Sequence, residues 1–224
     1  MKRAAAWLPL LLAAGLPAGV AMPAGAAEPA TGPAAAPWFD PTQLPSFTGT
    51  VDRYLVNPRG ETDGLLFREG PQIVFPPEAA AAVRLAAPPG KPITVWGIRA
   101  RKAPVITMLA FAPDGGQPPF VLDRFYWRPA ELPREPELQL QVAGSIRQPY
   151  YTPQGMVAGA ILQDGTVVLL PEDAPQAVRD RMQAGASLAA AGPGATNATG
   201  RALLAARIGE QPDAMRPVAQ AAAP

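Results

Sequence analysis

Glycines recur along this chain in two sets that match at a single offset of 95 residues. Every glycine between residues 49 and 97 has a counterpart between residues 144 and 192, with no gap. Glycine marks positions of positive φ or of close backbone approach, so a shared glycine pattern indicates a shared set of turns and bends. The sequence therefore predicts two copies of one small domain. The matching pairs are Gly49 and Gly144, Gly60 and Gly155, Gly64 and Gly159, Gly70 and Gly165, Gly90 and Gly185, and Gly97 and Gly192.

Alternation of apolar and polar residues, together with turn residues, predicts five strands in each copy. The second and third strands form a hairpin, for which Asp164-Gly165 in the second copy is a strong signal. The fifth strand of the second copy is expected to run from Arg201 to Ile208. In the first copy the strands are expected around residues 47–52, 64–67, 72–75, 93–97 and 105–111.

A helix is expected between the third and fourth strands of each copy. In the first copy Pro76-Pro77-Glu78 opens an alanine-rich stretch that ends at Pro88-Pro89-Gly90. In the second copy the helix is expected to open at Pro171-Glu172-Asp173. This order of elements is that of the OB-fold, although another small five-stranded barrel is also compatible with it. The predicted fold is mainly β, with two tandem small five-stranded OB-like barrels, each with one helix between strands 3 and 4.

Four short motifs give the chain a resemblance to a known family. They are G-x-V at Gly49–Val51, the DGLL strand at Asp63–Leu66, the Asp164-Gly165 hairpin and V-x-G at Val95–Gly97. Together they resemble the bacterial periplasmic OB-fold proteins, often called the BOF group. The resemblance implies an exported protein without assigned catalytic activity, in a binding or stress-related accessory role. This chain departs from that group in its two copies, its lack of His and its long proline-rich connector.

The N-terminus predicts export. Lys2-Arg3 precedes an apolar run from Ala4 to Leu16, and Ala24-Gly25-Ala26 has the small-x-small pattern of a signal-peptide cleavage site. The run is shorter than the roughly 20 residues of a membrane span, so a retained anchor is the less favoured alternative. The expected location is periplasmic or secreted, with no membrane span after signal removal.

Composition restricts the chemistry and the partners. The chain has no Cys and no His, which excludes disulfides, thiol nucleophiles and imidazole bases. Removal of Lys2 and Arg3 leaves 17 of the 19 basic residues against 18 acidic ones, a net charge of −1. This balance argues against nucleic acid as a partner. No metal site and no cofactor are predicted.

The expected organisation has six segments. They are a signal peptide (1–26), a disordered Ala/Pro-rich leader (27–45), the first OB-like barrel (46–112), a Pro-rich connector with an aromatic cluster (113–139), the second OB-like barrel (140–208) and a disordered tail (209–224). Trp38 and Phe39 of the leader are candidates to dock on the first barrel. The aromatic cluster at residues 123–128 fits base stacking, or, as the favoured interpretation, an extra strand that covers a barrel edge.

OB barrels bind ligands along strands 2 and 3 and with the loops that join strands 1 to 2 and 4 to 5. The second copy is neutral and aromatic in these loops, with Tyr150 and Tyr151 expected to pack against the connector. The first copy is charged there, which favours carboxylate or phosphate groups as ligands, although ordinary solvated loops are the alternative. The candidate ligand-binding residues are Asn57, Arg59, Glu61, Arg99 and Arg101.

Two functional classes remain open from the sequence. The favoured one is an exported, non-catalytic binding or scaffolding protein that holds a protein, a saccharide or a small anionic ligand. The alternative is an exported hydrolase or inhibitor that acts through acidic and hydroxyl groups only. Glu61 and Asp63 are candidates for the paired carboxylates of a glycoside hydrolase, although two acids this close on a loop are more often ordinary solvent-exposed residues. No catalytic residue is assigned.

Overall fold

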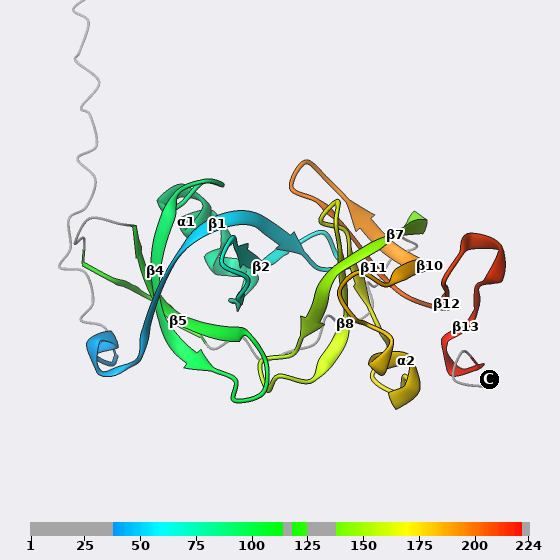
Figure 1. Cartoon of the computed structure of the whole chain (residues 1–224). Helices are drawn as coiled ribbons and strands as arrows, with labels where there is room; N and C mark the ends of the chain where they lie inside the picture. The colour runs from blue at the N-terminus through cyan, green and yellow to red at the C-terminus, as the bar shows by residue number, and fades with distance from the viewer. Residues whose placement is uncertain (1–37, 114–117, 125–137, 221–224) are drawn as a thin grey trace, which may run out of the picture. The chain divides into compact units, whose positions relative to one another are not determined.

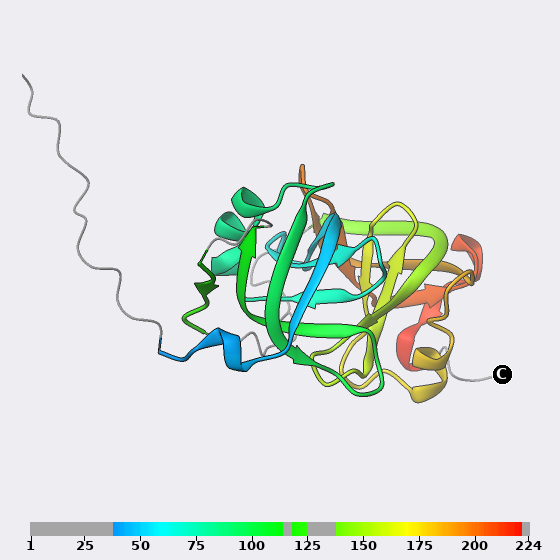
Figure 2. The same cartoon turned by 60° about the vertical axis from the view of Figure 1, so that its left-hand side comes forward.

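The computed structural model describes residues 38–113, 118–124 and 138–220. These residues form two closed β-barrels in one compact unit, and the two barrels lie side by side in both views (Figures 1 and 2). The predicted signal peptide and most of the predicted leader lie outside the described residues. No helix within the described ranges is long and apolar enough to cross a membrane.

The first barrel follows the order predicted from the sequence. Its strands pair in the order β3-β2-β1-β4-β5, and a parallel pairing of β3 with β5 closes the barrel. This is the strand order of an OB-fold, with the helix between the third and fourth strands. The elements are β1 (Ser46–Val56), β2 (Thr62–Phe67), β3 (Gln72–Val74), the 3-10 turn η2 (Pro77–Ala79), α1 (Ala80–Ala86), β4 (Pro92–Arg99) and β5 (Val105–Pro113).

The second barrel repeats this arrangement. Its strands pair in the order β9-β8-β7-β10, and β11 pairs with both β9 and β10 to close it. The prediction of two five-stranded barrels is therefore confirmed. The elements are β7 (Leu138–Tyr151), β8 (Val157–Leu162), β9 (Val167–Leu169), α2 (Gln176–Asp180), β10 (Ser187–Thr196), β11 (Arg201–Leu204) and β12 (Arg207–Gly209).

Strand register agrees between the barrels at the offset of 95 residues. Val51 pairs with Phe67 in the first barrel, and Ile146 pairs with Leu162 in the second. Both barrels also have a glycine at the position where the backbone of the neighbouring strand comes closest. A β-carbon at Gly97 would collide with the carbonyl oxygen of Thr107, and one at Gly192 with that of Leu204. The predicted equivalence of these glycines therefore has a common physical cause.

The fifth strand of the second barrel is interrupted, which corrects the expected single strand over 201–208. β11 ends at Leu204, and β12 resumes at Arg207 on the same neighbour, β10. Between them Ala205 donates its N–H to Leu169 O, and Ala206 donates to Ala191 O. The chain thus leaves β9 at this point while it stays beside β10, whereas β5 continues unbroken to Pro113.

The two helices differ in where they begin. In the first barrel a 3-10 turn from Pro77 leads directly into α1, as predicted. In the second barrel the helix begins at Gln176, five residues later than the expected Pro171. The reason is Pro175, because a proline disfavours the helical conformation in the residue before it. Ala174 closes a turn on Pro171 O instead, and α2 starts only after the proline.

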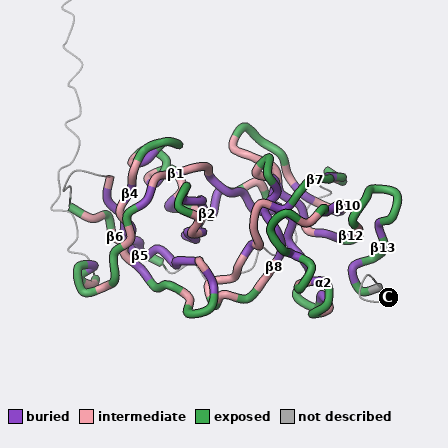
Figure 3. Tube along the Cα trace, viewed as in Figure 1, coloured by how far each residue is buried: buried purple, intermediate pink, exposed green. Residues whose placement is uncertain are grey.

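Each barrel has its own apolar core. Phe67, Phe75 and Ile93 are fully buried in the first, and Ile146, Leu162 and Val168 in the second. Buried stretches follow the strands, while exposed stretches lie mainly in loops and turns (Figure 3). The Tyr54 hydroxyl ties α1 to the first barrel by donating to Val83 O and Ala87 O. Burial raises the pKa of Tyr54 well above its usual value, against the opposing charge of Arg84.

Segments expected to be disordered contribute structure at both ends. In the leader, η1 (Pro41–Gln43) precedes β1, and Trp38 donates its indole N–H to Leu122 O. In the tail, η3 (Pro212–Ala214), β13 (Arg216–Pro217) and η4 (Val218–Gln220) follow β12, with Met215 and Val218 buried. The prediction of a disordered tail is therefore wrong for residues 209–220. Burial of apolar side chains orders this segment despite its Ala/Pro-rich composition.

The connector supplies one short strand. β6 (Phe120–Val121) pairs with β5, and β13 pairs with β12 at the corresponding place in the second barrel. Each barrel therefore carries a sixth, added strand at the same position. Residues 125–128 of the predicted aromatic cluster lie outside the described residues, so the cluster's two interpretations stay predictions.

Substitution Gly97→Ala should destabilise the protein by about 3 kcal/mol, because the added methyl has no room beside Thr107 O. Gly144→Ala is the matched control, since its nearest neighbour is Leu162 Cδ1 at 3.5 Å, an ordinary contact. It should change the unfolding free energy by less than about 0.5 kcal/mol. Urea unfolding of both variants measures this, and equal midpoints would contradict the close approach.

Candidate functional site

The faces expected to bind ligands in the two barrels pack against each other. One buried cluster contains Leu55 and Leu66 of the first barrel together with Tyr150 and Ile161 of the second. Leu55 and Tyr150 are equivalent positions, and so are Leu66 and Ile161. The strand 2 and strand 3 surfaces are therefore occupied by the neighbouring barrel. We call this contact the inter-barrel interface; its apolar members are Leu55, Val56, Leu66, Tyr150, Ile161, Val167, Leu169 and Ala202, with Val74, Ala103 and Val105 in an adjoining cluster.

The loops that flank the interface contact each other reciprocally. A β-carbon at Gly60, between β1 and β2, would lie 3.2 Å from the β-carbon of Ala195. A β-carbon at Gly155, between β7 and β8, would lie 3.0 Å from that of Ala100. Gly60 corresponds to Gly155, and Ala100 corresponds to Ala195. Such paired contacts are the mark of an approximate twofold relation between the barrels.

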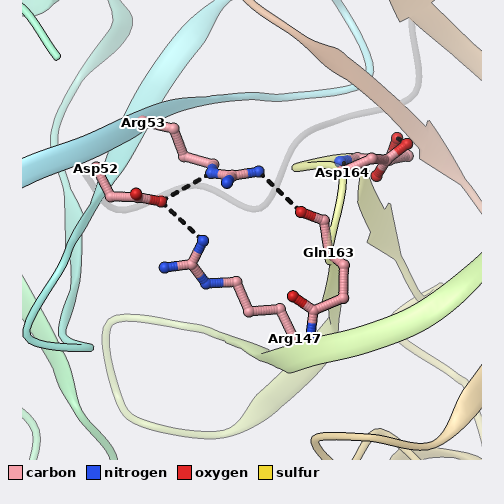
Figure 4. A network of polar contacts seen from close by, with 6 residues as sticks. Asp52, Arg53, Arg147, Gln163 and Asp164 are labelled. Atoms are coloured by element: carbon pink, nitrogen blue, oxygen red, sulfur yellow. Dashed lines mark hydrogen bonds and ion pairs between the residues drawn. The ribbon is translucent and has the colours of Figure 1, made fainter.

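A charged network lies where equivalent residues of the two barrels meet (Figure 4). Asp52 Oδ2 accepts from Arg147 Nη1 at 2.8 Å and from Arg53 Nε at 2.9 Å. Arg53 also donates to Gln163 O at 3.2 Å and lies across the turn at Gly165. Burial opposes ionisation of Asp52, but the hydrogen bond from Arg53 and the charge of Arg147 together lower its pKa.

Two reciprocal hydrogen bonds join the barrels near the adjoining cluster. The Gln72 side chain donates to Tyr151 O at 3.0 Å and accepts from Tyr151 N–H at 2.9 Å. Gln72 is fully buried, so these bonds satisfy an amide that has no access to water. The Tyr151 side chain packs on the cluster that contains Ala103 and Val105.

Three predicted site residues form one tight turn. The Asn57 side chain accepts from the N–H groups of Arg59 and Glu61 and donates to Glu61 Oε2 at 3.0 Å. Asn57 is buried, and Arg59 and Glu61 are exposed. Asn57 therefore shapes the loop, and its side chain is already engaged. The turn faces the second barrel, where Asn197 Nδ2 donates to Gly60 O at 2.7 Å.

The other two predicted residues line a hollow. Arg99 and Arg101 lie with Lys102 around a shallow concavity of about 520 Å³ formed by residues 99–104, which we call the basic loop. All three cations are exposed. Within the part of the chain that the structure describes, none of them makes a hydrogen bond or an ion pair. The basic loop contacts the β7–β8 turn, whereas the Asn57 turn contacts the β10–β11 turn, so the two loops face different parts of the second barrel.

The carboxylates considered for hydrolysis have different surroundings. Glu61 is exposed and accepts from Asn57, while Asp63 is buried. The hollow lies at the basic loop and does not include them. Among the described residues, no group of three His, Cys, Asp or Glu lies close enough to hold a metal ion.

The sequence reasoning missed the inter-barrel interface. Two signals were present. Leu65-Leu66-Phe67 and Ile161-Leu162 are continuous apolar runs, whereas a strand with one wet face alternates. Asp52 and Arg147 occupy equivalent positions with opposite charges, which suits a pair. The Gln72–Tyr151 bonds had no such signal, because neither residue type marks a pairing.

No protein-family model matches the chain, and no curated protein is significantly similar to it. The function therefore has to be argued from the residues.

Asp52→Asn should weaken the interface in a pH-dependent way. The folded-state pKa of Asp52 is lowered, so its carboxylate stabilises the protein above the unfolded pKa of about 3.9. That contribution disappears as the pH falls through the folded pKa. The variant should lose about 1 kcal/mol at pH 7, and the difference from wild type should vanish in strong acid.

Urea unfolding across this pH range measures the difference. Asp173→Asn is the control, because the exposed Asp173 side chain makes no hydrogen bond among the described residues. A constant difference between wild type and Asp52→Asn at every pH would contradict the role of the charged network.

Proposed function

We propose that the chain is an exported, non-catalytic binding or scaffolding protein that holds an anionic partner on its basic loop. The single observation that carries this proposal is the set of exposed cations around one hollow, Arg99, Arg101 and Lys102. Some other arginines of the described structure are engaged, since Arg147 binds Asp52 and Arg179 donates to four carbonyl groups, whereas unengaged cations such as Arg181 and Arg216 lie outside the hollow. Cations without partners are the ones available to an external anion.

The packing of the barrels supports the choice of this surface. OB barrels commonly bind along strands 2 and 3, but both of those faces are buried in the inter-barrel interface. Ligand binding there would require the barrels to separate. The basic loop belongs to the same binding region of the first barrel and remains open to solvent.

The chemistry of the loop favours acidic groups. A guanidinium presents a planar fork that suits carboxylate or phosphate, and two of the three cations are arginines. The hollow is shallow, which suits the surface of a protein or a saccharide better than an enclosed small molecule. The partner class is thus an acidic protein segment, an acidic saccharide or a small anion.

The proposal also covers where the protein acts and how its two barrels arose. The signal-like N-terminus and the resemblance to periplasmic OB-fold proteins support a periplasmic or secreted protein. The shared glycines and matching strand registers support a tandem repeat, in which one ancestral unit was duplicated and the copies then diverged. The charged loops would have diverged toward binding in the first copy only.

Replacing Arg99, Arg101 and Lys102 together by Gln should weaken anion binding about tenfold. Three exposed ion pairs are worth about 0.5 kcal/mol each, and their sum corresponds to that factor. Binding of an oligoglutamate peptide, heparin and inorganic phosphate to the full chain is measured by calorimetry at low salt. The preferred probe identifies the partner class, and added salt should weaken its binding.

A matched control variant separates the effect of the basic loop on binding from the effect of the net charge of the protein. Lys91, Arg181 and Arg216 are also exposed, and their side chains make no hydrogen bond or ion pair among the described residues. Changing these three to Gln alters the charge equally and should leave binding within about twofold, because they lie outside the hollow. Equal losses in both triple variants, or no binding by wild type to any probe, would reject the proposal.

A further inference from the structure

The two equivalent strand 4 to strand 5 loops are held in different ways. In the second barrel, Asn197 fixes the loop by accepting from Thr199 N–H and Gly200 N–H while donating to Gly60 O. Arg84 of the first barrel also donates to the Thr199 hydroxyl at 3.1 Å. That loop is neutral, and its polar side chains are already bonded.

Among the residues that the structure describes, no side-chain hydrogen bond holds the basic loop. Its backbone is fixed at its ends, where Ala100 N–H donates to Val105 O at 2.9 Å and Gln72 N–H donates to Pro104 O at 2.8 Å. Between these points lie Arg101 and Lys102, whose like charges repel each other. Any further support for the backbone of this loop therefore comes from outside the loop.

The second barrel supplies that support. Gly155 lies so close that a β-carbon there would be 3.0 Å from the β-carbon of Ala100 and 3.2 Å from that of Ala103. Both alanines line the hollow. Tyr151 packs on the cluster behind Ala103, and the back of the loop is thus closed by the second barrel.

Gln72 connects this support to the loop through hydrogen bonds. Its backbone N–H binds Pro104 O at the end of the basic loop, and its side chain binds both backbone groups of Tyr151. The equivalent residue in the second barrel is Val167, which lies in the apolar cluster. A polar side chain at this position therefore joins the barrels only at the end of the interface that carries the basic loop, whereas hydrogen bonds from Asn197 and Arg84 join them at the other end.

We infer that the second barrel positions the basic loop and thereby sets its anion affinity, with Gly155, Gln72 and Tyr151 as positioning residues. This inference rests on the proposed function. Holding the backbone that carries the three cations in place before binding reduces the ordering cost that binding must otherwise overcome. The second barrel then contributes to the binding site by positioning the loop, although it adds no charged residue to the hollow.

Two matched glycine variants test the inference. Gly155→Ala puts a methyl against the basic loop at a φ of +86°, and Gly60→Ala does the same at the opposite end of the interface at a φ of +81°. Both changes strain the backbone similarly. Gly155→Ala should weaken binding of the preferred anion probe, heparin or oligoglutamate, about fivefold, which is less than the loss expected when all three cations are removed. Gly60→Ala should alter it less than twofold.

Hydrogen exchange gives a readout that does not need a ligand. In the full chain, Gly155→Ala should speed exchange of the Ala100 and Gln72 amides about tenfold relative to wild type, and Gly60→Ala should not. Gln72→Met is a second variant for the case that Gly155→Ala fails to fold, and it should speed exchange at Tyr151 and Ala100.

The outcomes separate the inference from the proposed function. Wild-type protein that binds no probe, with exchange altered as expected, rejects the function but supports the positioning. Equal effects of Gly155→Ala and Gly60→Ala on affinity, or unchanged exchange at Ala100 in both Gly155→Ala and Gln72→Met, overturn the inference, because the second barrel would then act only on overall stability.

Discussion

The apolar faces of strands 2 and 3 of the two barrels pack against each other and exclude water. The rest of the molecule is arranged around that contact. Leu55, Leu66 and Ile161 are almost wholly buried in it. Burial of a large aliphatic side chain is worth about 1.5–3 kcal/mol, so separating the barrels would cost several such contributions. The barrels are consequently not independent modules, and a single isolated barrel would expose an apolar face. The loops around this face are left as the available surface.

Much of the fold was predictable because glycine reports backbone geometry directly. The collision that a side chain at Gly97 would make with Thr107 recurs at Gly192, so a single-residue pattern predicted strand pairing in both barrels. Two predictions failed for different reasons. The second helix begins late because of a local effect of Pro175. The tail is ordered by tertiary contacts, since Met215 and Val218 are buried in a segment whose composition resembles a loose tail.

The candidate site was only partly predictable, since each copy was interpreted as if its surface faced water. Loop charge marks Arg99 and Arg101 as candidates, and both line an open hollow. Asn57 was selected for its polarity, but its side chain is engaged in shaping its own turn. The role of Gln72 depends on a partner 79 residues away, a relation that no local pattern encodes.

The Asp52–Arg147 pair has a consequence for assembly. Equivalent residues meet at a twofold axis, so two identical first barrels joined by the same surface would bring Asp52 against Asp52, and two second barrels would bring Arg147 against Arg147. Each arrangement places like charges in contact, where they repel. Only the combination of one barrel of each kind makes the ion pair. The difference in charge at this single position therefore discriminates against self-association of either barrel and favours the pairing within one chain.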